Sequence, residues 1–600
     1  MSRAADYRPH RVQREDRLDG SIILRSGYDM GAVDSTIGSW IDRFSEQSPD
    51  AVFLAERSGA GWREITYQET WQSVRAIAAS LLDRGLGPQT PILILSGNSV
   101  DHGLLALAAQ YVGIPIVPLA EQYSLIPAAH PQLIHCAALV KPHLIFAEDG
   151  ERFGKALALS IFDGLEKVSS AKVGKQETPF TTLLRGGDAN KVDRAAASVS
   201  PDTVAKYLMT SGSTSNPKGV ITTHRMMCAN QTQIADALTF LKDRPPVIID
   251  WLPWNHVFGG SHNFNLMLAN GGSLYIDGGK PIKQLVGKTI ENLRLKSGTL
   301  SFNVPLGFAM IRDALRDNAE LRRRYFKDLD MIFYAGASLP QDVWADLESM
   351  ARDVRGDAPL MISSWGMTET APACLIVHEP IETSGIVGVP MTGLEIKLVP
   401  DDEMRCDLRV RGPNVTPGYL NDSAKTAELF DEEGFLISGD AVRFVDATKP
   451  ERGLRFDGRV SEDFKLSSGT WVRSANLRLA LLPRLASLAQ DIVICGADRM
   501  EVGLMIFPSP EAISIADGQT VDGAFISPAL QAAIKSRFEN QDDQGSATKV
   551  SRIIVLAEPP QMGDGEITAK GNLNFVKIIT RRSALLKRLY DDHDPAVIRL

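Results

Sequence analysis

Residues 207–220 form the most informative stretch of the sequence: Tyr207-Leu-Met-Thr210-Ser211-Gly212-Ser213-Thr214-Ser215-Asn216-Pro217-Lys218-Gly219-Val220. An apolar, strand-like run leads into small hydroxylated residues and glycines, and Pro-Lys-Gly closes the segment. Glycine allows backbone N–H groups to point inward at an anion, the hydroxyls add donors, and the lysine adds a positive charge. The stretch therefore predicts a phosphate-binding loop whose ligand-binding residues are Thr210, Ser211, Gly212, Ser213, Thr214 and Lys218.

Two other interpretations fit this stretch less well. A flexible Ser/Gly linker would not directly follow an apolar strand-like run or close with Pro-Lys-Gly. A P-loop, G-x-x-x-x-G-K-S/T, requires glycine at the position of Pro217 and a hydroxylated residue at that of Gly219. Pro217 also lacks the backbone N–H that such a cradle would use. We expect a phosphate loop of a different kind.

The sequence around this loop alternates between strand-like and helical patterns. Residues 91–95 are a compact apolar run, residues 106–111 are helical, and residues 114–118 are a second apolar run. This order is typical of parallel β-α-β units. Further strands are predicted at 62–67, 144–147, 247–250, 273–276, 331–335 and 360–363, a helix at 74–82, and loops at 150–155 and 174–198.

The pattern changes to short strands and turns beyond about residue 409, and a new apolar run occupies residues 491–495. A chain of 600 residues exceeds what one hydrophobic core normally supports. We expect an α/β protein with a large N-terminal domain of layered β-sheets and helices, residues 1–457. A smaller α+β domain is expected over residues 458–600.

Composition excludes several classes of protein. The net charge of −9 argues against a general nucleic-acid binder, which normally carries a basic face. The five cysteines are scattered and include no C-x-x-C pair, which favours a reducing cytoplasm over a disulfide framework or a zinc site. The N-terminus lacks the apolar core of a secretory signal. Residues 103–120 are apolar, but Gln110, Pro115 and Pro118 interrupt them, so no membrane span is predicted.

The run T-S-G-S-T-S-N-P-K-G resembles the signature of the adenylate-forming superfamily, which contains acyl-CoA synthetases, firefly luciferase and the adenylation domains of peptide synthetases. Ser364-Trp-Gly-Met-Thr-Glu-Thr370 is similar to the family's aromatic-Gly-x-Thr-Glu segment. By this resemblance, Glu369 holds Mg²⁺, a cation that prefers oxygen ligands. Thr368 contacts phosphate, and Trp365, where the family usually has Tyr, offers its face to adenine, beside Gly366 and Met367.

Further segments follow in the family's order. Tyr334-Ala-Gly336-Ala337-Ser338-Leu-Pro340 resembles the adenine-side loop, and in isolation it is equally well a plain turn. Ser438-Gly-Asp440 resembles the segment whose aspartate binds both ribose hydroxyls, and Arg459 would add a ribose or phosphate contact. Arg409–Pro413 and Pro417-Gly-Tyr419 match family segments with less evident chemistry.

The acyl side of the site is expected near His256, because residues 251–260 resemble the family's Pro-x-x-His segment. We expect the acyl pocket to be lined by residues 254–263, 303–308, 335–336 and 367–372, whose Trp, Phe and Met side chains suit a planar aromatic acid and leave a short or medium fatty acid open. The family's adenylation lysine corresponds best to Lys570, although the order Lys570-Gly571 is reversed here, and Lys577 is the alternative. Ser461 stands where the family often has Asp or Lys at the hinge of its small, mobile C-terminal domain.

The resemblance implies an acid–thiol ligase that uses ATP and Mg²⁺ to form an acyl-adenylate and then transfers the acyl group to coenzyme A. Residues 7–25, 250–264 and 462–472 are most similar to the feruloyl-CoA synthetase group, which implies a hydroxycinnamic acid as substrate. The alternatives are an aliphatic or other aryl acid, or a non-catalytic nucleotide-binding relative. The chain ends at Leu600, which favours free coenzyme A over a fused carrier domain. The sequence does not distinguish a monomer from a homodimer.

Overall fold

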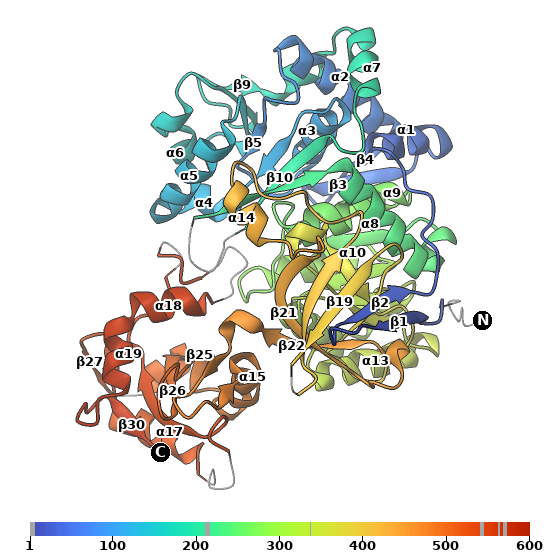
Figure 1. Cartoon of the computed structure of the whole chain (residues 1–600). Coiled ribbons are helices and arrows are strands. Elements are labelled where there is room, and N and C mark those ends of the chain that lie inside the picture. Colours follow the sequence, from blue (N-terminus) through green and yellow to red (C-terminus); the bar gives the residue numbers. More distant parts are fainter. Residues whose placement is uncertain are drawn as a thin grey trace.

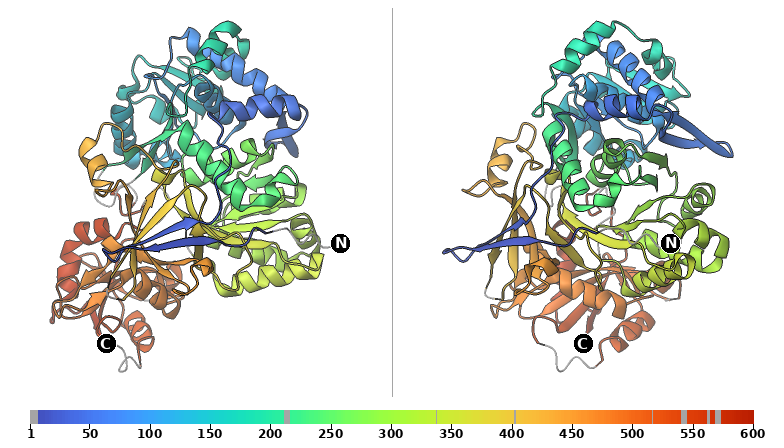
Figure 2. Two further views of the ribbon diagram at one scale, coloured as in Figure 1. Left: turned by 45° about the vertical axis from the view of Figure 1, so that its right-hand side comes forward. Right: turned by 90° about the vertical axis from the view of Figure 1, so that its right-hand side faces the viewer.

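A computed structural model describes residues 7–210, 216–336, 338–401, 403–515, 517–539, 545–561, 564–567 and 573–600, and confirms the mixed α/β class. In Figures 1 and 2 the helices and strands between residues 38 and 200 lie at the top, and strands β1 (Val12–Asp16) and β2 (Ile22–Ser26) lie in the middle of the molecule. The segment that follows β22 (Leu454–Arg459) lies in the lower part. Between them lies an extended, twisted sheet.

Among the described residues, the largest sheet has eleven strands in the order β1-β2-β19-β20-β21-β22-β18-β17-β16-β15-β14. Strands β14, β15 and β16 run parallel and align Phe302, Phe333 and Ile362, so their carboxyl ends meet at one edge. The other pairs in the sheet are antiparallel. The strands are β1 (Val12–Asp16), β2 (Ile22–Ser26), β14 (Leu300–Asn303), β15 (Met331–Tyr334), β16 (Leu360–Gly366), β17 (Ala373–Ile376), β18 (Ile386–Pro390), β19 (Glu395–Pro400), β20 (Cys406–Arg411), β21 (Leu436–Phe444) and β22 (Leu454–Arg459).

A second sheet has the order β11-β10-β6-β5-β7-β8-β9 and contains the predicted β-α-β unit. Strand β10 pairs parallel with β6 but antiparallel with β11, and its last residue, Thr210, pairs with Lys218 at the start of β11. The predicted phosphate loop therefore joins two antiparallel strands, whereas a P-loop joins a strand to a helix. The strands are β5 (Ile92–Ile94), β6 (Ile116–Pro118), β7 (Leu144–Asp149), β8 (Glu166–Ala171), β9 (Thr178–Pro179), β10 (Val204–Thr210) and β11 (Lys218–Thr223).

A third sheet has the order β12-β13-β3-β4 and shares the main hydrophobic core with the other two. Its strands are β3 (Val52–Ser58), β4 (Gly61–Thr66), β12 (Val247–Asp250) and β13 (Ser273–Ile276). The strands expected at 247–250 and 273–276 are confirmed to the residue. Residues of β13 are buried on both faces, which explains its apolar run, whereas buried and half-buried residues alternate along β12.

Helices connect and cover these sheets, and local capping sets several of their starts. Helix α2 begins with a capping box in which Thr66 and Glu69 bond reciprocally. The helices of this region are α1 (Gly38–Gln47), α2 (Tyr67–Asp83), α3 (Val100–Tyr111), α4 (Glu121–Leu125), α5 (His130–Val140), α6 (Gly154–Leu157), α7 (Ala189–Ala197), α8 (His224–Ala237), α9 (Phe264–Ala269), α10 (Val286–Leu295), α11 (Pro305–Asp317), α12 (Ala319–Phe326), α13 (Gln341–Arg355) and α14 (Ser423–Glu428).

Both expected loops contain regular structure, and helix α6 begins inside the first, at Gly154. The region 174–198 was expected to be a loop, but it contains β9 and helix α7. The side chain of Asp188 accepts a hydrogen bond from the backbone N–H of Asn190 and so caps the start of α7. Val192 is the buried residue that holds this otherwise polar helix against the core. A single apolar anchor gives too weak a periodic signal to be recognised in the sequence.

The segment after β22 forms hydrophobic clusters of its own, made from residues 464–600. Its elements are β23 (Phe464–Lys465), β24 (Trp471–Val472), α15 (Ser474–Arg484), β25 (Ala489–Cys495), β26 (Val502–Pro508), α16 (Pro510–Ile515), β27 (Gln519–Val521), β28 (Ala524–Ile526), α17 (Pro528–Ser536), β29 (Val550–Val555), α18 (Phe575–Arg581), α19 (Ser583–Leu589) and β30 (Val597–Arg599). Ion pairs join it to the larger part: Arg405 to Asp463 at 2.6 Å and Arg473 to Asp401 at 2.9 Å.

All five cysteines are free and buried. Burial raises the pKa of the Cys136, Cys374 and Cys495 thiols to about 12 and that of Cys406 to about 11, and it also raises the pKa of Cys228. None of these thiols would be a thiolate near neutral pH, so they act as small core residues. Among the described helices, none has both the length and the apolar character needed to cross a bilayer.

Lys206 on β10 is an exceptional core residue, with 4% of its surface exposed. Its Nζ donates a hydrogen bond to the backbone oxygen of Gly260 at 2.8 Å, and within the described residues it has no carboxylate partner. Burial lowers its pKa from 10.5 to about 7, because a charged ammonium is poorly solvated there. The folded chain therefore holds this lysine largely as a neutral amine above pH 7.

Replacing this lysine with methionine, which has a similar shape, should stabilise the protein at neutral pH. Between pH 7 and 10.5 the unfolded chain binds a proton at Lys206 that the folded chain lacks, so wild-type stability rises with pH through this window. The stability gained by Lys206→Met should therefore shrink by about 2 kcal/mol between about pH 7 and about pH 9. Urea unfolding of both proteins at the two pH values measures this, with Lys283→Met at an exposed position as control. A difference that does not change with pH would mean that the folded state keeps Lys206 charged.

Candidate functional site

Residues from three different segments meet at the predicted phosphate loop. Lys218 at the start of β11 places its Nζ 4.6 Å from the ring centroid of Tyr419. The hydroxyl of Tyr419 donates a hydrogen bond to Oε1 of Glu369 at 2.9 Å. A cation and a carboxylate thus contact the two ends of one tyrosine side chain. Within the described residues, Lys218 itself forms no ion pair, so its ammonium is available to an anionic ligand.

The backbone fixes the position of Tyr419. Leu420 donates its N–H to the Gly219 oxygen at 2.8 Å, Ile221 donates to the Gly418 oxygen at 3.1 Å, and Val220 and Tyr419 form an antiparallel bridge. The φ angle of Gly418 is +142°, and a Cβ there would collide with Thr426. The segment is therefore held to β11 through main-chain contacts that require glycine at position 418.

Glu369 lies in a short 3₁₀ helix, η6 (Thr368–Thr370), directly after β16. Thr368 and Glu369 are 6% and 5% exposed, and Thr416 donates its N–H to the Glu369 backbone oxygen at 2.8 Å. One Glu369 oxygen accepts from Tyr419, which leaves the second able to bind a cation. Among the described residues, no group of three or more His, Cys, Asp or Glu side chains could enclose a metal. A single carboxylate fits Mg²⁺, which usually combines one or two carboxylates with substrate phosphates and water.

Asp440 on β21 is the second carboxylate of the site. It receives a hydrogen bond from Nε1 of Trp365 on Oδ2 at 2.9 Å, and Nε of Arg459 lies 3.5 Å from Oδ1. Trp365 is 5% exposed and belongs to the main core. The contact between Trp365 and Asp440 was not predicted from the sequence. The indole N–H is the single side-chain donor of Trp365, which stands where the family usually has Tyr. The indole thus orients the carboxylate.

The remaining predicted nucleotide contacts are partly visible. Gly336 follows β15 with a φ of +87°, and both Gly336 and Ser338 are exposed. Gly366 ends β16, and Met367 caps η6 by donating its N–H to Thr370 at 3.0 Å. The predicted residues Ser211, Gly212, Ser213, Thr214, Ala337 and Lys570 lie outside the described residues. Lys577, the alternative to Lys570, is on α18, where Asn574 caps the helix start.

The predicted acyl side is built around an irregular helix. His256 precedes a π-helix, η5 (Phe258–Asn263), and its Nδ1 accepts a hydrogen bond from the N–H of Phe258 at 3.2 Å. A Cβ on Gly259 or Gly260 would collide with backbone oxygens of residues 252–254, so these positions need glycine. The buried amine of Lys206 satisfies the Gly260 oxygen. Short π-helical segments of this kind frequently occur at functional sites.

An aromatic cluster adjoins η5. The rings of Phe258, Phe302 and Phe333 contact His262, which is 1% exposed. Phe302 and Phe333 lie near the carboxyl ends of parallel strands β14 and β15, the edge where α/β sheets bind ligands. Phe308, by contrast, packs in a separate helical core. His262 was missed as a candidate because nothing in its local sequence distinguishes it from a buried structural histidine.

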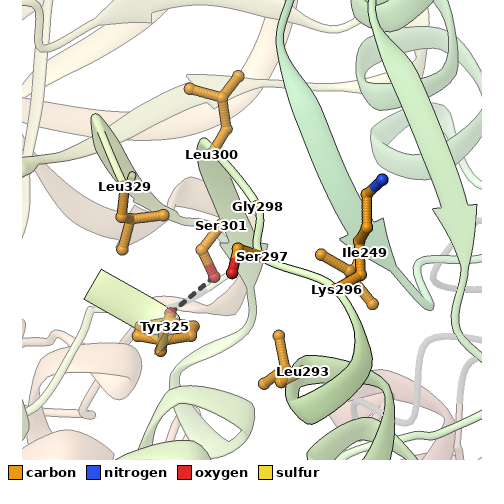
Figure 3. A pocket seen from close by; sticks show the side chains of 9 residues that line it. All are labelled: Ile249, Leu293, Lys296, Ser297, Gly298, Leu300, Ser301, Tyr325 and Leu329. Carbon is orange, nitrogen blue, oxygen red and sulfur yellow. Dashed lines mark hydrogen bonds between the residues drawn. The ribbon is translucent and has the colours of Figure 1, made fainter. Parts of the chain in front are cut away.

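Two pockets outside this site contain none of the predicted residues. The pocket in Figure 3 lies toward the amino ends of β14 and β15. It is lined by Ile249, Leu293, Lys296, Ser297, Gly298, Leu300, Ser301, Tyr325 and Leu329. In the second pocket, Arg63 pairs with Glu56 at 2.8 Å and Arg152 pairs with Glu148 at 2.8 Å, so its main charges satisfy one another.

Comparison with known proteins supports the resemblance to the adenylate-forming superfamily. A methyl-dioxo-octahydroindenyl-propanoyl:CoA ligase of Rhodococcus jostii (strain RHA1) is 26% identical over 472 residues, which cover 76% of this chain and 86% of that protein.

Two solved structures share the fold. The anthranilate CoA ligase AuaEII in complex with anthranoyl-AMP has a TM-score of 0.72 at 17% identity, covering 93% of this chain and 99% of that one. The o-succinylbenzoate coenzyme A synthetase of Bacillus subtilis, with ATP and magnesium, has a TM-score of 0.65 at 16% identity, covering 90% and 99%.

The family model described as "AMP-binding enzyme" matches residues 41–420, a range that includes Lys218, Glu369 and Tyr419. Because the match spans more than half of the 600 residues, the chain belongs to the AMP-binding enzyme family.

Proposed function

We propose that this protein is an acid–thiol ligase that joins a carboxylic acid to coenzyme A through an acyl-adenylate, with AMP and pyrophosphate as the other products. The observation that carries the proposal is the group Lys218, Tyr419 and Glu369, which holds a cation and a carboxylate in place without pairing them. That arrangement suits a phosphate chain and its metal ion. The family match and the similarity to a CoA ligase support the same reaction.

In the first half-reaction, the residues of the site would position ATP. Lys218 would bind phosphate oxygens, Thr210 and Thr368 would donate hydroxyl hydrogen bonds, and Glu369 would hold Mg²⁺, which neutralises charge on the phosphates. Asp440, oriented by Trp365, would accept hydrogen bonds from the ribose hydroxyls, and Arg459 would add a positive charge nearby. Gly336 and Ser338 would face adenine. Catalysis would consist mainly of alignment of the acid with the α-phosphorus and stabilisation of charge there.

In the second half-reaction, the thiol of coenzyme A would attack the acyl carbon and release AMP. We propose residues 458–600 as a mobile domain that swings about residues 459–461, withdrawing Lys570, or alternatively Lys577, and admitting the thiol. The separate hydrophobic clusters of this segment support the division. The contacts to be broken would include the Arg405–Asp463 and Arg473–Asp401 ion pairs.

The acid that we propose is a hydroxycinnamate. Phe258, Phe302 and Phe333 pack together on the acyl side and would provide flat apolar surface, and the N–H of Phe258 donates to His256. Similarity of residues 250–264 to the feruloyl-CoA synthetase group supports this choice. The fold shared with a ligase solved as its anthranoyl-AMP complex is compatible with an aryl acid. An aliphatic acid is the second candidate.

The assay that tests the proposal is pyrophosphate release with Mg-ATP and separate ferulic, coumaric, benzoic, hexanoic and palmitic acids, with and without coenzyme A. We expect release with the hydroxycinnamates and a thioester only when coenzyme A is present. Pyrophosphate release only with an aliphatic acid would support the ligase activity but would contradict a hydroxycinnamate as the substrate. If no acid leads to pyrophosphate release in a protein that still binds ATP, the non-catalytic alternative would be supported.

Tyr419→Phe should weaken the use of magnesium. The variant keeps the ring beside Lys218 but removes the hydroxyl that orients Glu369, leaving a buried carboxylate without that donor. We expect about a 10-fold rise in the Mg²⁺ concentration that gives half-maximal pyrophosphate release, since about 1.4 kcal/mol corresponds to tenfold.

Thermal unfolding serves as the control for this variant, because the backbone contacts of residues 418–420 remain. Tyr419→Leu should add a loss of ATP affinity through Lys218. Equal magnesium requirements in Tyr419→Phe and wild type would show that the hydroxyl does not position Glu369.

A further inference from the structure

Lys206 is a buried lysine to which the proposed reaction assigns no task. It lies on β10, the strand that leads into the phosphate loop, and its amine donates to the backbone oxygen of Gly260 on η5 at 2.8 Å. Its histidine neighbours, His102 and His224, give it no negative partner, because burial chiefly lowers the pKa of each to about 4 and leaves both rings neutral near pH 7. Within the part of the chain that the structure describes, the amine therefore joins β10 to η5 without an ion pair.

This contact is costly for the fold. Removing an ammonium group from water is unfavourable, which is why burial lowers the pKa of Lys206 to about 7. One hydrogen bond to a carbonyl oxygen contributes little net stability, because the amine gives up hydrogen bonds to water in exchange. A methionine would fill a similar space without that cost. The stability of the fold alone gives no reason for a lysine at this position.

Two other buried side chains also hold η5. Nε2 of Gln231 on α8 donates to the backbone oxygens of Ser261 at 3.1 Å and His262 at 3.3 Å. Nδ2 of Asn263 donates to Asp250 on β12 at 2.9 Å, and burial raises the pKa of that carboxyl group to about 7. Three neighbouring elements, β10, α8 and β12, therefore fix the position of η5.

The π-helix η5 is itself costly in stability. Positions 259 and 260 require glycine, because a Cβ at either would collide with backbone atoms of residues 252–254. Several buried side-chain atoms on or beside η5 have no hydrogen-bond partner among the described residues, and each such atom is unfavourable. These atoms are Oε1 of Gln231, Oγ of Ser261, Nε2 of His262 and Nδ2 of Asn265. Local costs of this kind are typical of functional sites, where geometry takes precedence over stability.

Lys206 connects the two halves of the proposed site. Strand β10 leads into the loop in which Lys218 would bind phosphate, and η5 follows His256 on the acyl side. In the first half-reaction, a carboxylate oxygen of the acid forms a bond to the α-phosphorus while the bond from that phosphorus to pyrophosphate breaks. The reacting atoms must approach to about 3–3.5 Å, and a misplacement of about 1 Å can slow such a step by about 100-fold. The position of η5 relative to the phosphate loop therefore matters for this step.

We propose that Lys206 is a positioning residue of the adenylation step, because its hydrogen bond to Gly260 fixes the acyl side of the site relative to the phosphate loop. The inference rests on the proposed ligase function and adds a residue to it. Lys206 acts through the backbone of η5 and not by contact with a reacting atom. Gln231 supports the same segment from α8.

The test compares Lys206→Met with wild type at pH 7, with the acid that gives the fastest pyrophosphate release. The variant should unfold at a higher urea concentration than wild type, yet its kcat for pyrophosphate release should fall by about 10- to 100-fold. The KM for ATP should change by less than about twofold, because Lys218, Glu369 and Tyr419 keep their contacts. Lys283→Met, at an exposed position, is the matched control.

The second half-reaction separates positioning from a general loss of structure. Thiolysis by coenzyme A of the supplied acyl-adenylate should slow by less than about threefold, because a covalent bond already aligns the acyl group with AMP. Lys206→Gln retains an N–H donor without an ammonium group and should recover part of the lost kcat. Gln231→Leu removes the donor to Ser261 and His262, and should likewise slow adenylation and spare thiolysis.

The outcomes distinguish this inference from the proposed function. A Lys206→Met protein as active as wild type would reject the role of Lys206 and leave the ligase function intact. A variant that is less stable than wild type, or that loses rate equally in both half-reactions, would show a structural role and also contradict the inference. If wild type releases no pyrophosphate with any acid, the ligase function itself fails, and this inference fails with it.

Discussion

The site depends on one hydrogen bond, from the hydroxyl of Tyr419 to the carboxylate of Glu369. Lys218 belongs to the sheet that contains β10 and β11, while Glu369 follows β16 of the eleven-stranded sheet defined by the described residues. Tyr419 touches both, and main-chain bonds fix its segment to β11. The segment of residues 418–420 therefore links the two sheets. Without it, the carboxylate of Glu369 would lose the side-chain contact that orients it relative to Lys218.

The acyl side relies on a different device, an irregular helix supported by buried polar groups. Gly259 and Gly260 let η5 approach the backbone of residues 252–254, where any Cβ would collide. The π-helical geometry changes the backbone hydrogen bonds, and Lys206 satisfies the Gly260 oxygen from β10. The same strand therefore leads into the phosphate loop and supports the wall of the acyl side. Positions on the two halves of the site are coupled through β10.

The sequence predicted the local features well and the long-range contacts poorly. Apolar runs located β12 and β13 to the residue, and Pro217 and Gly219 excluded a P-loop, in agreement with the antiparallel pairing of β10 and β11. Asp440 and Glu369 were named from motifs, but the partners that orient them, Trp365 and Tyr419, were not assigned those tasks. These contacts join residues that are 75 and 50 positions apart in the sequence. The hydrophobic periodicity of a helix or strand does not predict contacts over such separations. The buried bond from Asn263 on η5 to Asp250 on β12 likewise joins two different elements.

The burial of all five cysteines has a practical consequence for studying the enzyme in motion. Maleimide and methanethiosulfonate reagents attack thiolates, and protonated thiols inside a packed core react with them slowly. The natural cysteines should therefore react very little with thiol-specific labels. Single cysteines introduced on exposed surfaces before and after residue 459 could carry a fluorophore pair or spin labels without removing any natural cysteine. The distribution of distances between those labels, recorded through a catalytic cycle, would then come from the introduced sites alone.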